Sequence, residues 1–139
     1  MRAKPDTARR VPDRHAEADP LPFSLMTAPA LLGLNSTFQE RDALRERRGG
    51  MRLQMSPADA AAKGLRDGQE VVAFNALGEV RFLLSVTAKV PPGVVVAEGV
   101  WWQTFAPGDR TVNALTSQRL TDMGGGSTFY DNQVDVRGA

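Results

Sequence analysis

The chain of 139 residues is long enough for one domain with a single modest core. Its composition, with 42% apolar and 24% charged residues, is ordinary for a globular protein, and a net charge of +1 lacks the basic excess that a dedicated nucleic-acid binder needs. The absence of cysteine and the single histidine, His15, exclude disulfides, iron–sulfur ligation, a catalytic thiol and a metal site built from several imidazoles.

The first twenty residues differ in character from the rest of the chain. Residues 1–20 are charged, contain prolines and hold almost no large apolar side chains, so they cannot offset the entropy of ordering. We interpret them as a flexible tail or linker and place the domain in residues 21–139. The apolar run Leu21–Leu34 is too short to span a membrane, and acidic residues separate it from the upstream arginines, which is untypical of a signal peptide. We therefore expect a cytoplasmic protein without a membrane span.

Short apolar segments along the chain predict a mainly β structure. The predicted strands are Phe23–Thr27, Met51–Met55, Val71–Phe74, Val80–Val86, Val94–Ala97 and Phe129–Val136. In Val80–Val86 the apolar residues share one face, whereas the continuous apolar run Val94–Ala97 is typical of a strand buried on both faces. Because an open sheet of this size would expose both edges, we expect the sheet to close into a barrel.

Two helical segments are suggested by local signals. Ser56 suits an N-cap, Pro57 suits the first helical position, and Gly64 suits the left-handed residue that ends a short helix. Between Glu40 and Arg52 the chain holds five arginines and three acidic residues. One interpretation of this segment is a phosphate clamp. The interleaved acids favour the other, a solvated loop or short helix that ends at Gly49-Gly50.

Small hydrogen-bonding residues gather in two loop segments. Thr27 is followed by Asn35, Ser36 and Thr37, and a second group contains Asn113, Thr116, Ser117, Thr121 and Asp122. Such side chains can contact phosphate oxygens and the edges of heterocycles, but they also form turns and caps, and residue chemistry alone favours the turns. The glycine run at 124–126 is open to the same two interpretations, a flexible turn or a close approach to a bulky ligand.

Several short motifs occur in a fixed order along the chain and include these segments. The motifs are Met55–Ala60, Gly64-Leu65, Asp67–Val71, Asn75–Val80, Val94–Trp102, Val112–Thr116, Thr121-Asp122, Phe129-Tyr130 and Val134, preceded by Leu25–Thr27 and Leu34–Ser36. Together, over residues 21–136, they resemble the C-terminal cofactor-binding domain of the molybdopterin-dependent oxidoreductases, the dimethyl sulfoxide reductase and formate dehydrogenase superfamily.

The resemblance implies a fold and a role. It implies a six-stranded double-psi β-barrel with short helices in its connections, which binds molybdopterin guanine dinucleotide and caps it. Other domains of the family supply the protein ligand of the molybdenum or tungsten. The chain is therefore expected to be a fragment or a separate subunit that works with the catalytic N-terminal domains of an oxidoreductase and has no catalytic activity on its own.

The resemblance also implies which residues contact the cofactor. These are Thr27, Asn35, Ser36, Asn113, Thr116, Phe129 and Tyr130, and no catalytic residue or metal ligand is expected in the chain. Trp101 and Trp102 are explained as aromatic residues of the core beside the site. One alternative is a cofactor-free barrel that serves as a protein-binding adaptor. Another is a self-processing barrel enzyme, but its Gly-Ser pair, Gly126-Ser127, falls in a loop.

Overall fold

The computed structural model describes residues 20–139. The predicted tail, residues 1–20, falls outside the described residues apart from Pro20, so the division into a tail and a domain stays a prediction.

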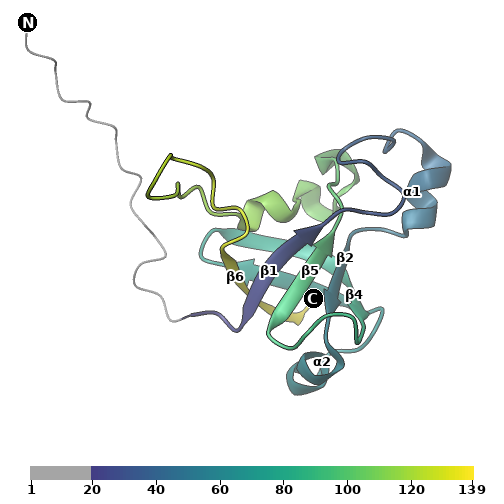
Figure 1. Ribbon diagram of the computed structural model, residues 1–139. Helices are drawn as coiled ribbons and strands as arrows, with labels where there is room; N and C mark the ends of the chain where they lie inside the picture. The colour runs from purple at the N-terminus through teal and green to yellow at the C-terminus, as the bar shows by residue number, and fades with distance from the viewer. Residues whose placement is uncertain (1–19) are drawn as a thin grey trace, which may run out of the picture.

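Six strands in the described part of the chain form a closed barrel (Figure 1). They are β1 (Phe23–Ala28), β2 (Arg52–Met55), β3 (Glu70–Asn75), β4 (Gly78–Val86), β5 (Val94–Glu98) and β6 (Asn132–Gly138). The neighbour order is β1-β5-β2-β4-β3-β6, and β6 closes onto β1. β1 pairs with β5 and β2 with β4 in parallel, whereas the other neighbours are antiparallel. The predicted fold class, a six-stranded barrel with short helices in its connections, is confirmed.

The barrel interior is filled by alternate residues of the strands, as period-two patterning requires. On β4 the predicted face is confirmed, since Val80, Phe82 and Leu84 are all buried. The prediction that β5 is buried on both faces is wrong. Val95 and Ala97 are buried, but their neighbours on the outer face are only half-buried, because a closed barrel has a single interior.

The predicted short helix is confirmed as α2 (Pro57–Lys63). The Ser56 hydroxyl accepts a hydrogen bond from the Asp59 backbone N–H at 3.1 Å, and Gly64 ends the helix with φ 66°. The Asp59 carboxylate also accepts a hydrogen bond from the Gly93 N–H at 2.9 Å, which ties the helix to the turn before β5. Helix α2 covers one end of the barrel, and α1 (Asp42–Arg48) lies at the other (Figure 1).

The last strand begins three residues later than the sequence predicts. The Asp131 N–H donates to the Thr128 carbonyl oxygen at 3.0 Å, so residues 128–131 form a turn and β6 starts at Asn132. The buried Asn132 side chain holds this turn, since its amide donates to the Phe129 carbonyl oxygen and its oxygen accepts from the Ser117 N–H at 2.8 Å. Phe129 and Tyr130 therefore lie in a turn beside the barrel and not within a strand.

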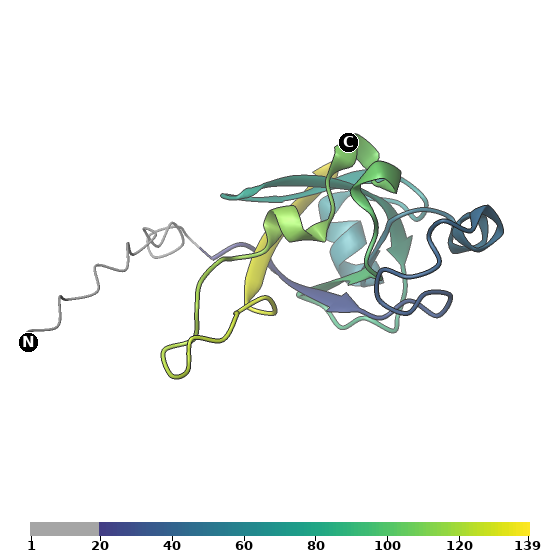
Figure 2. The ribbon, with the colours of Figure 1, turned by 90° about the horizontal axis from the view of Figure 1, so that it is seen from above.

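The long connections emerge at the end of the barrel where α1 lies. Because β1 and β5 are parallel, both finish there, and their antiparallel neighbours β6 and β2 begin there. The connection from β5 to β6 contains three short 3-10 helices, η1 (Gln103–Phe105), η2 (Pro107–Asp109) and η3 (Val112–Leu115), seen in green in Figure 2. Beyond η3 an extended loop projects from the barrel in both views (Figures 1 and 2).

The glycine run lies in that projecting loop. The Thr121 hydroxyl accepts a hydrogen bond from the Gly126 N–H at 2.9 Å, and the Thr121 N–H donates to the Gly126 carbonyl oxygen at 2.8 Å. Gly124 and Gly125 take positive φ angles of 91° and 63° in the turn thus closed. Of the two interpretations of the glycine run, the structure therefore agrees with a turn.

Candidate functional site

Three adjoining cavities surround the end of β5. The Tyr130 cavity, of about 200 Å³, is lined by residues that include Thr27, Ala30, Asn35, Gly99, Val100 and Tyr130. The Asn113 cavity, of about 70 Å³, is lined by residues that include Glu98, Gly99, Val100, Trp101, Thr111 and Asn113. The Arg48 cavity, of about 210 Å³, is lined by residues that include Ala30, Arg47, Arg48, Arg52, Glu98 and Trp101. Glu98 and Trp101 line both the Arg48 and the Asn113 cavity, and Gly99 and Val100 line both the Asn113 and the Tyr130 cavity, so the three cavities adjoin one another.

Three of the residues predicted from the resemblance meet in the Tyr130 cavity. Thr27 lies near the end of β1, beside Ala97 of β5. Asn35 lies in the following connection with φ 51°, a left-handed conformation that asparagine tolerates better than most residues. Tyr130 lies in the turn before β6, half-exposed, with its ring centroid 4.4 Å from that of Phe129.

Asn113 lies in the neighbouring cavity with its side chain available. It belongs to η3, where Val112 and Leu115 are buried and anchor the helix to the barrel. The Asn113 backbone carbonyl accepts a hydrogen bond from the Thr116 N–H at 3.2 Å. The side-chain amide is exposed and makes no hydrogen bond to any residue in the described part of the chain. An amide in this position offers both donors and an acceptor to a ligand.

The remaining three predicted residues do not line these cavities, and their backbone or side-chain groups have local partners. The Ser36 carbonyl oxygen accepts a hydrogen bond from the Trp102 indole N–H at 2.7 Å. The Thr116 hydroxyl donates to the Val112 carbonyl oxygen at 3.3 Å, and the Phe129 carbonyl oxygen accepts from Asn132. Their contacts with a cofactor stay predictions.

Gln39 holds the rim of the site together, and no sequence pattern singled it out. It is only 1% exposed although it lies in a polar connection. Its side-chain amide donates to the Val100 carbonyl oxygen, and its side-chain oxygen accepts from the Trp102 N–H at 2.6 Å. The side-chain amide thus pairs with the backbone as a neighbouring strand would, through one donor and one acceptor. It fixes the segment after β5 against the segment after β1. A lone glutamine carries no signal of such a role in the sequence.

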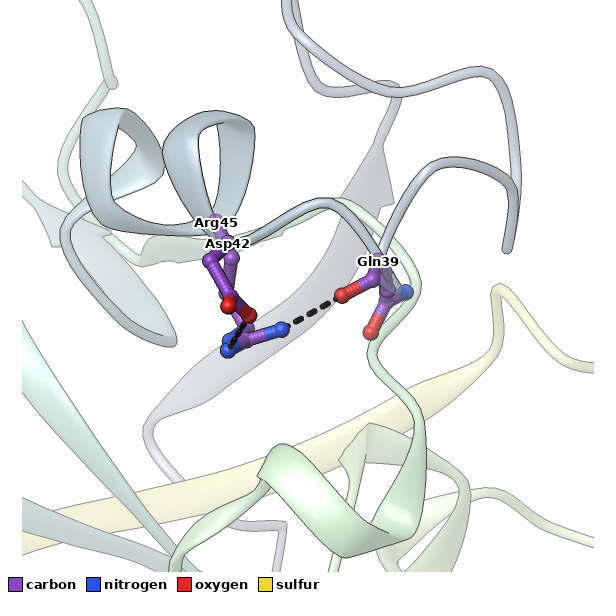
Figure 3. Close-up of polar contacts among 3 residues, drawn as sticks. All are labelled: Gln39, Asp42 and Arg45. Atoms are coloured by element: carbon purple, nitrogen blue, oxygen red, sulfur yellow. Dashed lines mark hydrogen bonds and ion pairs between the residues drawn. The ribbon is translucent and has the colours of Figure 1, made fainter.

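The arginine-rich segment forms α1, which ends at Gly49 with φ 68°, so the predicted short helix is confirmed. Figure 3 shows how Arg45 anchors it: the guanidinium donates to the Gln39 carbonyl oxygen at 2.7 Å and pairs with Asp42. The same guanidinium lies 4.0 Å from the ring centroid of Phe105. Arg45 is therefore a structural residue of α1 and not a free cation.

Arg48 is only partly exposed within this largely exposed helix. Its Nη2 atom is buried and has no hydrogen-bond partner among the described residues, and its guanidinium lies 4.3 Å from the ring centroid of Trp101. Burial lowers the pKa of the Arg48 guanidinium, and the nearby Glu98 carboxylate partly offsets this effect. The indole N–H of Trp101, which is 6% exposed, also lacks a partner among residues 20–139.

A family model described as the molydopterin dinucleotide binding domain matches residues 23–133. The chain belongs to this family. Its membership confirms the resemblance seen in the motifs and the molybdopterin cofactor that the resemblance implied. The match begins at the start of β1 and ends within β6, so it includes every segment that lines the three cavities.

Known relatives of this molybdopterin-binding domain are much longer proteins. The chain is 36% identical over 115 residues to the probable oxidoreductase YoaE of Bacillus subtilis, covering 83% of this chain and 17% of that protein. It is 34% identical over 109 residues to the dimethyl sulfoxide reductase DmsA of Escherichia coli, covering 74% and 13%. Among solved structures, the acetylene hydratase of Pelobacter acetylenicus superposes with a TM-score of 0.70 at 16% identity, covering 84% and 18%. That likeness shows a shared fold.

The hollowed end of the barrel fits a dinucleotide cofactor in its donor set. It presents the Asn113 amide, the Tyr130 ring and the buried nitrogen donors of Arg48 and Trp101, which have no partner in the part of the chain that the structure describes. Within residues 20–139 no group of His, Cys, Asp and Glu side chains is arranged to hold a metal ion. The same residues contain no helix long and apolar enough to cross a membrane.

Proposed function

We propose that the end of the barrel around β5 binds molybdopterin guanine dinucleotide and covers it in a molybdenum or tungsten oxidoreductase. The chain acts as the cofactor-capping C-terminal domain, either as a fragment or as a separate subunit, and the remaining domains supply the metal's protein ligand and the substrate pocket. When bound, the cofactor supplies the metal centre at which oxidation or reduction takes place. Location in the cytoplasm stays a prediction.

One observation carries the proposal. Thr27, Asn35, Asn113 and Tyr130 come from separate segments of the chain, yet they line adjoining cavities that share Gly99 and Val100. The fold brings them together because β1 and β5 end side by side and β6 begins beside β1. A ligand that occupies both cavities would contact residues up to about a hundred positions apart in sequence, as 27 and 130 are.

Each residue has a distinct task in this proposal. The Asn113 amide donates to and accepts from a heterocycle edge, which matches the mixed donors and acceptors of guanine or a pterin. The Tyr130 ring offers an aromatic face for a base. Thr27 and Asn35, which line the same cavity as Tyr130, offer neutral hydrogen-bonding groups.

The surface around the site supports a role beside other domains. Leu31 is 93% exposed and Leu34 is 70% exposed, both in the connection that carries Asn35, and Trp102 is 40% exposed. Apolar side chains gathered in this way mark surfaces that a partner covers. The catalytic domains of an oxidoreductase are the proposed partner, because the relatives DmsA and YoaE are much longer than this chain.

A cofactor-free adaptor would share this apolar surface but would have no use for Asn113. The two functions are separated by titrating the full chain with guanosine monophosphate, followed through the fluorescence of Trp101 and Trp102. Replacing Asn113 with alanine should cost ~1–3 kcal/mol of binding free energy, or roughly 5- to 150-fold in affinity, with little change in the thermal melt.

The matched control is Gln118→Ala, which removes an exposed amide from the same connection, outside the three cavities described. It should leave both affinity and melting unchanged. An affinity that is the same in wild type and Asn113→Ala, together with a lowered melt for Asn113→Ala, would assign that residue to the turn and contradict the proposal.

A further inference from the structure

Two residues that line the Arg48 cavity carry donors that nothing in the described chain satisfies. The Nη2 atom of Arg48 and the indole nitrogen of Trp101 are buried and have no acceptor among residues 20–139. Both groups carry donors only, so the missing partner must present acceptors. Leaving such groups unpaired in a native fold is rare and costly, which makes two of them on one cavity a signal of a ligand.

The Arg48 side chain is held by packing from two sides. A methyl group built on Gly99 would collide with the Arg48 Nη2 atom, and one built on Gly33 would lie 3.3 Å from Nη1. The Trp101 ring packs against the same guanidinium. The guanidinium is thus confined between the connection after β1 and the end of β5, so little side-chain entropy is left to lose on binding.

The charge of the cavity is positive. Arg47 and Arg52 line it together with Arg48, and Glu98 is the one acid on its lining. Glu98 lies beside Arg48 and also accepts a hydrogen bond from the Gln54 side chain at 3.3 Å. Three guanidinium groups against one carboxylate leave a net charge of +2 on the lining. This charge favours an anionic acceptor.

We propose that the Arg48 cavity binds an oxyanion of the phosphate class. A cavity of about 210 Å³ has room for more than a single water, which needs only ~10–15 Å³ on the same measure. Arginine forks match phosphate oxygens in geometry and charge. Ala30 lines both this cavity and the Tyr130 cavity. The diphosphate of a dinucleotide can therefore occupy the Arg48 cavity while its nucleoside occupies the Tyr130 cavity. This source of the phosphate rests on the proposed function.

The site is tested with inorganic pyrophosphate, added to the full chain and followed by calorimetry and by the fluorescence of Trp101. Arg48→Met should weaken binding about tenfold or more, because it removes the buried charged donor. Arg41→Met is the matched control, since it removes an equal charge from the N-cap of α1 and lies off the cavity lining. It should change the affinity by less than about twofold.

Thermal melts of each variant show whether it folds. If Arg48→Met does not fold, Arg52→Met tests the same cavity from an exposed side chain at the start of β2, with an expected loss of about threefold or more. The proposal is overturned if wild type shows no saturable binding up to about 10 mM pyrophosphate. It is equally overturned if folded Arg48→Met, or Arg52→Met in its place, binds pyrophosphate as tightly as wild type.

Guanosine diphosphate and guanosine monophosphate separate the two sources of the phosphate. If the cofactor supplies it, the diphosphate binds more tightly than the monophosphate, and Arg48→Met removes that difference while Asn113→Ala preserves it. If pyrophosphate binding depends on Arg48 but guanosine adds nothing, the oxyanion site stands and the proposed function fails. If guanosine monophosphate binding depends on Asn113 but Arg48 affects no ligand, the proposed function stands and this inference fails.

Discussion

At the scale of single residues, buried polar groups define the site more sharply than charged ones. Gln39 is almost wholly inaccessible and bonds both to the Val100 carbonyl oxygen and to the Trp102 N–H. Val100 lines two of the cavities, so the position of this part of their walls depends on one amide. Arg45, by contrast, holds α1 in place through its hydrogen bond to the Gln39 carbonyl oxygen and its ion pair with Asp42 (Figure 3).

Replacing Gln39 with leucine should destabilise the fold. Leucine keeps the size of the side chain but leaves the Val100 carbonyl and the Trp102 N–H without their partner, at about 2–3 kcal/mol of unfolding free energy. The measurement is a denaturant titration of each variant. Gln118→Leu, at an exposed amide, is the control and should stay within about 0.5 kcal/mol of wild type. Equal stability of the two variants would show that the Gln39 bonds are dispensable.

The sequence also shows which residue roles can be predicted. Thr27, Asn35, Asn113 and Tyr130 were found because they match a family motif, and the structure brings them to adjoining cavities. Gln39 is not singled out by the sequence, and for the segment that contains Arg48 the sequence offers a phosphate clamp but favours a solvated helix. The contacts of these two residues with Val100 and Trp101, more than fifty positions away, have no local signal. Burial of a polar side chain is a property of tertiary packing, and local patterning carries no trace of it.

At the scale of elements, short sequence signals predict the structures that form between residues close in sequence, namely a short helix and a hairpin. Helix α2 follows from Ser56, Pro57 and Gly64, each of which has its expected place in the cap geometry. The hairpin of β3 and β4 follows from alternation and a short turn, in which the Asn75 side chain accepts a hydrogen bond from the Leu77 N–H at 2.9 Å. The parallel pairing of β1 with β5 joins segments about seventy residues apart and has no local signal. The start of β6 was missed because an asparagine side chain sets it.

The end of β5 offers a prediction about backbone and packing together. Gly99 has φ +77° and Gly93, just before the strand, has φ +82°, so alanine at either position costs about 1–2 kcal/mol of conformational strain. A methyl group on Gly93 meets nothing within 4 Å, whereas one on Gly99 lies 2.9 Å from the Ala30 Cβ and collides with Arg48. Gly99→Ala should therefore be less stable than Gly93→Ala by a further ~1–3 kcal/mol.

Thermal melts of the two glycine variants give this difference directly, because the strain of the left-handed backbone is common to both. Gly99→Ala should also lose pyrophosphate binding, since the collision displaces the Arg48 guanidinium, and Gly93→Ala should keep it. Equal melting temperatures for the two variants would show that the end of β5 has room for a side chain and that Arg48 is not confined there.

At the scale of the whole molecule, the two ends of the barrel carry different elements. Helix α2 lies at one end, where Ser56 and Asp59 fix the turns around it. The other end carries α1 and the 3-10 helices (Figures 1 and 2). The three cavities surround the end of β5 there, and Leu31, Leu34 and Trp102 are exposed apolar side chains of the adjoining connections. The relative YoaE is covered by this chain over only 17% of its length.

The central claim is that the end of the barrel around β5 binds the guanine dinucleotide cofactor. It is tested most directly by recording the backbone amide NMR shifts of the full chain during titration with guanosine diphosphate. The predicted result is saturable shifts at Thr27, Asn35, Gly99, Asn113 and Tyr130, with the amides of α2 (Pro57–Lys63) unchanged. Shifts centred on α2, or no shift anywhere at millimolar nucleotide, would contradict the claim.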